Sequence, residues 1–179
     1  PEAIIGFSNK AFYGGKIKVM SPNLDGSKTV ELRVVKEGRV DNNATANKAE
    51  CEEIIKTVQQ IISNNDSITI GIISPFRAQV DLIKKALYSV FDTDTIEKHS
   101  IETGTAHTFQ GDERDIMLLS WTVAPNSHSQ SVMFAQKPNL FNVALTRARK
   151  KLINFISKDV NELPMGLLRD YLEFVQKIN

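Results

Sequence analysis

Several residue types and patterns that would assign a protein to a special class are scarce in this chain of 179 residues. Its single cysteine, Cys51, excludes an intrachain disulfide framework. Its three histidines are widely spaced and predict no structural zinc site. No apolar run reaches the length of a membrane span, and no signal-peptide pattern is present. We therefore expect a cytoplasmic protein without a metal site and without a membrane partner.

An excess of charge of one sign is also lacking. The 22 Lys and Arg residues nearly balance the 21 Asp and Glu residues, which gives a net charge of +1. This total says little about partners, because a local basic surface can exist within a balanced chain. A hydrophobic content of 41% and a charged content of 24% are typical of an ordinary globular domain. We expect one domain over residues 1–179, with a lead-in over 1–43 and a core over 44–179.

The hydrophobic periodicity predicts that helices and strands alternate. β-branched and apolar residues cluster in five predicted strands: 29–35, 67–73, 101–106, 115–121 and 151–157. Helical spacing or helix start signals predict five helices: 2–13, 44–63, 75–91, 138 to about 150, and 162–178. Thr45 or Asn47 is a candidate N-cap for the second helix. Residues 91–99 are expected to be an acidic connection, and residues 125–131 are the best candidate for disorder. This order predicts an α/β fold, a parallel sheet with helices on both faces.

A compact polar turn lies between two of the predicted strands and reads Thr108-Phe109-Gln110-Gly111-Asp112-Glu113. Open α/β folds bind ligands at sheet edges, so the turn is a candidate site. The amide of Gln110 can both donate and accept a hydrogen bond, which suits the orientation of a nucleotide or of a water molecule. Gly111 is expected to supply a positive φ or to let a backbone amide approach a phosphate closely, and the two roles are compatible.

A second polar stretch follows Pro138, a plausible helix start. It reads Asn142-Val143-Ala144-Leu145-Thr146-Arg147-Ala148-Arg149 and continues with two lysines. If all of it is helical, Arg147 and Arg149 lie about 200° apart around the axis and cannot face the same ligand. We expect one of the two guanidinium groups to enter a cleft while the other pairs elsewhere.

These stretches resemble motifs V and VI of superfamily 1 helicases, in the branch of the nonsense-mediated-decay helicase. The patterns are T-x-H-x-F-Q-G-x-E-x-D over residues 105–115 and N-V-A-L-T-R-A-R over residues 142–149. Residues 74–79 resemble the S/T-P-[FY]-x-x-Q segment of the same motor domain, and residues 1–15 resemble the segment directly after the family's Y-R-M-H-P motif. The resemblance covers most of the chain and implies the second RecA-like domain of a DNA or RNA helicase.

The resemblance implies ATP-binding and catalytic roles for residues in both motifs. It implies an arginine finger at Arg147, because charge developing on the γ-phosphate requires a fixed cation. Gln110 orients the nucleotide or the attacking water, Gly111 approaches a phosphate, and Glu113 accepts from a ribose hydroxyl. Structural alternatives stay open: Arg147 balances the dipole of its helix, Gln110 is a surface turn residue, and Glu113 is a solvent-facing carboxylate.

The resemblance also implies contacts to the backbone of single-stranded nucleic acid. Ser74 and Pro75 lie at the carboxyl end of a strand and at the amino end of a helix, which favours a phosphate contact. Thr105 and His107 share one side of an extended segment. The alternative for His107 is a satisfied structural histidine. We expect a structural role for Asp115, beside Arg114 at a strand start.

ATP and Mg²⁺ are the implied cofactors, yet part of their site is missing from this sequence. The chain contains no G-x-x-x-x-G-K-[ST] loop and no acidic strand end suited to Mg²⁺. We expect both on an N-terminal RecA-like domain of the same polypeptide, and Pro1 as the first residue suggests a fragment. The chain alone is therefore predicted to be inactive. Two other functions stay open: a stand-alone nucleic-acid or nucleotide-binding module, and a degenerate motor half that binds protein.

Overall fold

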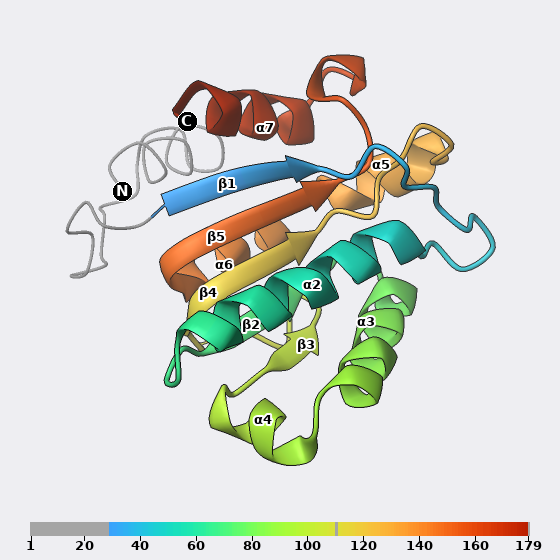
Figure 1. Cartoon of the computed structure of the whole chain (residues 1–179). Coiled ribbons are helices and arrows are strands. Elements are labelled where there is room, and N and C mark those ends of the chain that lie inside the picture. The colour runs from blue at the N-terminus through green and yellow to red at the C-terminus, as the bar shows by residue number, and fades with distance from the viewer. Residues whose placement is uncertain (1–28, 110, 179) are drawn as a thin grey trace.

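The computed structural model describes residues 29–109 and 111–178, and it contains one five-stranded sheet (Figure 1). The strands are β1 (Thr29–Val34), β2 (Ile70–Ile73), β3 (Glu102–Gly104), β4 (Arg114–Ser120) and β5 (Ala148–Ile156). Their order in the sheet is β1-β5-β4-β2-β3, and every pairing is parallel. The predicted parallel sheet and α/β class are confirmed.

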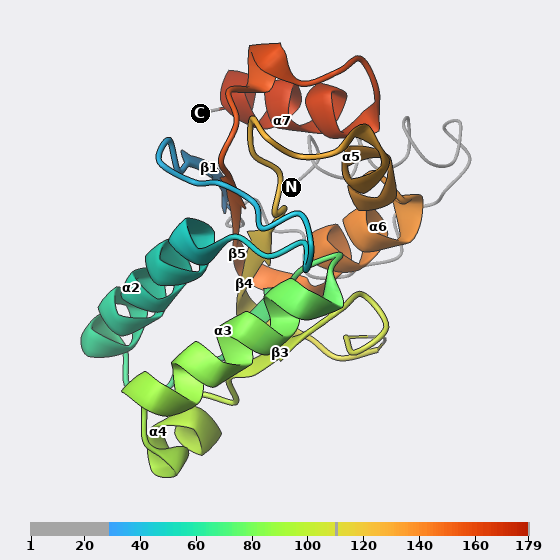
Figure 2. The same cartoon turned by 90° about the vertical axis from the view of Figure 1, so that its right-hand side faces the viewer.

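Helices cover both faces of the sheet (Figure 2). One face carries α2 (Lys48–Asn64), α3 (Arg77–Val90) and the short α4 (Thr93–Lys98). The other face carries α5 (Ser129–Ala135), α6 (Pro138–Arg147) and α7 (Leu167–Ile178), which follows a 3-10 turn over Val160–Glu162. Strands buried on both faces need apolar residues at successive positions, which explains the continuous run Ile70-Gly71-Ile72-Ile73.

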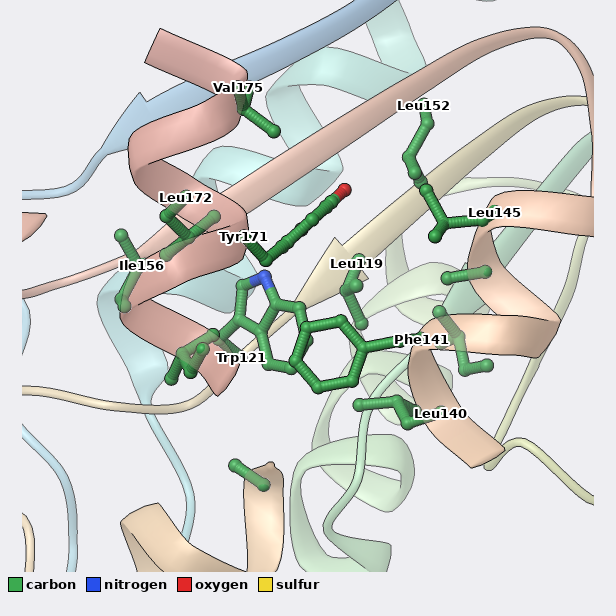
Figure 3. Packing of buried hydrophobic residues seen from close by; sticks show 14 of the residues in the cluster. Leu119, Trp121, Leu140, Phe141, Leu145, Leu152, Ile156, Tyr171, Leu172 and Val175 are labelled. Atoms are coloured by element: carbon green, nitrogen blue, oxygen red, sulfur yellow. The ribbon is translucent and has the colours of Figure 1, made fainter. Parts of the chain in front are cut away.

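Each face of the sheet has its own hydrophobic core. The core under α2 and α3 is aliphatic apart from one cysteine and one phenylalanine, whereas the core under α5, α6 and α7 is centred on aromatic rings. There, the Trp121 ring lies 4.9 Å from the Phe141 ring and 6.1 Å from the Tyr171 ring, between centroids (Figure 3). Asn154 Oδ1 accepts from both the Trp121 indole N–H and the Tyr171 hydroxyl. The polar atoms of these buried aromatic residues are thereby paired.

Three local predictions are wrong. The connection predicted over 91–99 contains α4, which begins because Asp92 caps it by accepting from Thr95 N. The segment predicted to be disordered enters α5, and Asn126 within it exchanges two hydrogen bonds with the backbone of Val40, at 2.9 and 2.8 Å. The helix that begins at Pro138 ends at Arg147 instead of continuing to about 150, because residues from Ala148 onward pair with β4. Arg149 therefore lies on a strand, and helical spacing does not describe its position relative to Arg147.

The other predicted elements within the described residues are present, but several ends differ: the helices predicted from 75 and 162 begin at Arg77 and Leu167, and the strand predicted over 101–106 is Glu102–Gly104. Asn47, one of the two candidate caps, accepts from Glu50 N at 3.0 Å and begins α2. The helix predicted over 2–13, the remainder of the lead-in up to residue 28, and Gln110 lie outside the described residues. No helix in the described part of the chain is long and apolar enough to cross a membrane.

Candidate functional site

The parallel sheet has two different edges, and the predicted site residues that the structure describes divide between them. The arrowheads in Figure 1 point to the carboxyl edge, which comprises the residues directly after each strand. The residues directly before β2, β4 and β5 form the amino edge. Residues 105–109 leave β3 at the carboxyl edge, and residues 111–113 enter β4 at the amino edge, so the described parts of this connection lie at opposite ends of the sheet. Phe109, which is fully buried, anchors this segment in the aromatic core.

At the amino edge, the turn before β4 is exposed. Gly111 has a φ of +82°, and a side chain placed there would meet only open space, so the backbone conformation rather than crowding selects glycine. This confirms the expected positive φ. Glu113 is also exposed, with its carboxylate available to a ligand.

The pairing of β4 with β5 brings Arg147 next to this turn. Arg114 of β4 and Ala148 of β5 are register partners. The residues directly before them, Glu113 and Arg147, therefore lie at neighbouring strand starts. Arg147 is half-buried, and its Nε is buried without a hydrogen-bond partner in the described part of the chain. A buried donor left unpaired is uncommon and calls for an explanation.

The other arginines of the amino edge are already engaged. Arg114 pairs with Glu102 at 2.9 Å and with Asp112 at 3.1 Å. Arg149 pairs with Asp115 at 3.5 Å. Among the described residues, Arg147 forms no such ion pair, so its guanidinium is the one left for a ligand.

Asp115 has the contacts of a structural residue. It accepts hydrogen bonds from Thr69 N at 3.0 Å and from Thr69 Oγ1 at 3.1 Å, which fixes the chain just before β2. Burial by itself would raise the pKa of Asp115, but the Thr69 hydrogen bonds and the charges of Arg149 and Lys150 lower it below its ordinary value. The carboxylate is therefore ionised at neutral pH and holds the strands together.

At the carboxyl edge, Ser74 and Thr105 lie side by side because Ile73 pairs with Gly104 and Ser74 N donates to Gly104 O at 3.2 Å. Ser74 is fully buried, and its Oγ lies 3.2 Å from Thr122 Oγ1 and accepts from Phe76 N. The Ser74 hydroxyl thus fixes the turn instead of facing solvent.

Three residues predicted to contact nucleic acid, Pro75, Thr105 and His107, contribute to the surface at the carboxyl edge. His107 is exposed, whereas Pro75 and Thr105 are half-buried. These three residues come from the ends of two paired strands, so the structure brings them to one end of the sheet. The backbone donors and hydroxyls of such loops are the groups that contact phosphates in open α/β folds.

Sequence reasoning missed a buried carboxylate at the same edge. Glu50, in the first turn of α2, is 0% exposed, and burial raises its pKa to about 7 although three hydrogen bonds oppose the rise. Its two oxygens accept from donors on separate segments of the chain. The spacing Asn47-x-x-Glu50, which matches a capping box, could have indicated the pair but not the burial.

No group of histidine, cysteine, aspartate and glutamate side chains within residues 29–109 and 111–178 is arranged to hold a metal ion. The candidate site has two parts. Arg147, Gly111 and Glu113 lie at the amino edge, and the loops that follow β2 and β3 lie at the carboxyl edge.

Comparisons with known proteins show the family to which this chain belongs. The helicase/nuclease JHS1 of Arabidopsis thaliana, which acts in DNA replication, is 36% identical over 133 residues, or 72% of this chain and 9% of that protein. Helicase sen1 of Schizosaccharomyces pombe is 28% identical over 122 residues, or 66% of this chain and 7% of that protein. A family model described as an AAA domain matches residues 1–159. This chain belongs to that family, within the superfamily 1 helicases.

This helicase domain is a small part of its relatives. DNA polymerase alpha-associated DNA helicase A of Saccharomyces cerevisiae is 35% identical over 85 residues, which are 48% of this chain and 11% of that protein. The chain thus spans about a tenth of the length of these relatives. It corresponds to the C-terminal motor domain of the nonsense-mediated-decay helicase branch.

A solved structure supports the same fold. The C-terminal domain of a possible DNA helicase from Lactobacillus plantarum WCFS1 superposes on this helicase domain with a TM-score of 0.50, over 87% of this chain and 84% of that chain. The identity is 13%, so the likeness shows the fold alone. That fold is the RecA-like α/β arrangement predicted from the sequence.

Proposed function

We propose that this domain is the second half of an ATP-dependent DNA or RNA motor, with a nucleotide at its amino edge and a single strand at its carboxyl edge. The observation that carries the proposal is the buried Nε of Arg147, which lies beside the Gly111 turn and has no hydrogen-bond partner among the described residues. All other proposed roles follow from the position of each residue relative to these two edges.

At the amino edge, Arg147 acts as the arginine finger. Its Nε has no partner in the described chain, and a guanidinium offers several donors in one plane to phosphate oxygens. Gly111 lets a backbone amide approach a phosphate, Glu113 accepts from a ribose hydroxyl, and Gln110 orients the nucleotide or the attacking water. ATP, when bound, supplies the phosphoanhydride bond that is hydrolysed.

The rest of the ATP site belongs to another domain in this proposal. The described residues contain no acidic cluster for Mg²⁺, and the sequence has no phosphate-binding loop. An N-terminal RecA-like domain of the same polypeptide supplies both. The relatives' much greater length supports this proposal, and the isolated chain is expected to lack ATPase activity. A cytoplasmic location stays a prediction.

At the carboxyl edge, Pro75, Thr105 and His107 contact the backbone of a single strand, and Ser74 fixes the turn that presents Pro75. Contacts to phosphate and sugar carry little sequence information, so affinity should fall with salt and depend weakly on base composition. Residues 105–113 join both edges, so closure of the two motor domains on ATP changes the grip on the strand.

The test is the ATPase activity of the full-length protein that carries this domain, measured with and without single-stranded DNA and RNA. Arg147→Ala should lower turnover by about a thousandfold or more. Arg149→Ala is the matched control, because Arg149 lies two residues away and pairs with Asp115. Unchanged turnover in Arg147→Ala would refute the finger and favour a binding module or a protein-interaction domain.

A further inference from the structure

A single buried carboxylate connects the segments that meet at the carboxyl edge. Glu50 Oε1 accepts from Ser120 Oγ and from Thr122 N, both at 3.0 Å. Glu50 Oε2 accepts from Asn47 Nδ2 at 2.7 Å and from Ser157 Oγ at 2.8 Å. The donors come from the last residue of β4, the loop after it, the loop before α2 and the residue after β5. Glu50 therefore joins three separate parts of the chain.

The contacts continue from Glu50 to the proposed binding surface. Thr122 Oγ1 lies 3.2 Å from Ser74 Oγ, which in turn accepts from Phe76 N at 3.2 Å. Pro75, between these two residues, is part of the proposed surface for the strand. A continuous path of hydrogen bonds thus runs from the buried carboxylate to the turn that presents Pro75.

Thr122 is the strained link in this path. Its φ is +59°, in the left-handed region that β-branched residues rarely adopt. Such conformations persist where the surroundings fix them and cluster at functional sites. Here the bond from Thr122 N to Glu50 and the contact of its hydroxyl with Ser74 hold the conformation.

Among the described residues, the groups that donate hydrogen bonds to Glu50 are polar, and none carries a positive charge that would compensate the buried carboxylate. Gln79 of α3 completes this environment, because Gln79 Nε2 donates to Ser120 Oγ and to Asn47 O, and Asn47 N donates to Gln79 Oε1. No charged residue contributes to the pKa of Glu50; its causes are burial and hydrogen bonds. The four donors need acceptors, and a carboxylate supplies them from one side chain.

We propose that Glu50 is a positioning residue for nucleic-acid binding: it holds Thr122 in its left-handed conformation and, through Ser74, fixes the Pro75 turn. This inference rests on the proposed function of the carboxyl edge. It also makes a distinction, because the ATP-binding residues lie at the opposite edge. Loss of the Glu50 contacts should weaken the grip on the strand and leave ATP binding unchanged.

The experiment uses the full-length protein and measures ATPase activity against the concentration of an unstructured single strand and, separately, of ATP. Glu50→Ala should raise the strand concentration for half-maximal activity by about tenfold, equivalent to about 1.4 kcal/mol. Glu50→Gln keeps the shape but replaces one oxygen, which accepts from two donors, by an NH2 group that only donates. The hydroxyl among those two donors can reverse and accept from the NH2 group, which leaves one donor without an acceptor, so the effect should be smaller in the same direction. The KM for ATP should change by less than about twofold in both variants. That change is much smaller than the roughly tenfold increase expected for the strand concentration in Glu50→Ala.

Two further variants keep the test decisive if Glu50→Ala does not fold. Ser157→Ala removes one donor to Glu50 and should act like Glu50→Gln. Thr57→Val removes a different buried hydroxyl of α2, which accepts from Arg33 and does not contact Glu50. This variant should change neither the half-maximal strand concentration nor the KM for ATP. The inference would be overturned if Glu50→Gln changed the half-maximal strand concentration and the KM for ATP equally, or changed neither of them. A wild-type protein that no strand stimulates would overturn the proposed function itself.

Discussion

The titration of Glu50 gives a prediction about stability whose sign and size follow from the structure. The folded-state pKa is about 7, whereas the ordinary value is 4.5. Because the folded chain binds this proton more tightly, the stabilising contribution is fully present below about pH 4.5 and is lost as pH rises through about 7. Each pKa unit of separation is worth about 1.4 kcal/mol, so the full contribution is about 3 kcal/mol.

The measurement is the free energy of unfolding of the 179-residue chain in urea, at about pH 5 and about pH 8, for the wild type and for Glu50→Gln. The variant lacks the titrating group but keeps the other carboxylates. The lowered pKa values of Glu31 and Asp115 make stability fall toward low pH in both proteins, so they cancel in the comparison. The advantage of the wild type over the variant should therefore grow by up to about 3 kcal/mol toward pH 5.

A constant difference between the two pH values would refute this reasoning. It would mean that the four donors keep Glu50 ionised throughout and that they offset the cost of burial. Nuclear magnetic resonance of the Glu50 side-chain carboxyl carbon would then show no titration near pH 7.

Two further outcomes test other parts of the molecule. Trp121→Ala, at the centre of the aromatic core, should lower the free energy of unfolding by about 3–5 kcal/mol, measured in urea. A loss below about 1 kcal/mol would contradict the packing around this residue. Gly111→Ala should cost about 1 kcal/mol of stability, because its φ of +82° strains any side chain, and it should also lower the ATPase activity of the full-length protein. A stability equal to that of wild type would show that the turn relaxes easily.

The regular elements of this domain could be predicted from the sequence because their signals are local. The apolar run from Ile68 to Ile73 has a length and composition that fit a buried strand, and Asn47 has the chemistry of an N-cap. Where prediction failed, a partner distant in sequence decided the outcome. The helix that ends at Arg147 stops because Ala148 pairs with Arg114 of β4, and no local pattern contains that information.

The candidate site shows the same division. The motif residues that the structure describes lie at the two edges, but their surroundings could not be inferred from the sequence. Ser74 looked like a surface contact at a strand end, whereas the fold buries its hydroxyl against Thr122, which is 48 residues away in sequence. In the sequence, Glu50 has the pattern of an ordinary acidic residue in the first turn of a helix. Its burial could not be inferred, because three of its four hydrogen-bond donors are at least 70 residues away in sequence.

The junction between α6 and β5 determines how Arg147 can move. The helix ends at Arg147 and the strand begins at Ala148, with no residue in between. The backbone of Arg147 thus lies directly between a packed helix and an interior strand of the sheet, with no loop on either side of it. If Arg147 is the proposed finger, its backbone can approach a phosphate on another domain only by rotation of this whole domain. The proposal then predicts that the rate of turnover depends on the rotation of the two motor domains relative to each other and not on the motion of a loop.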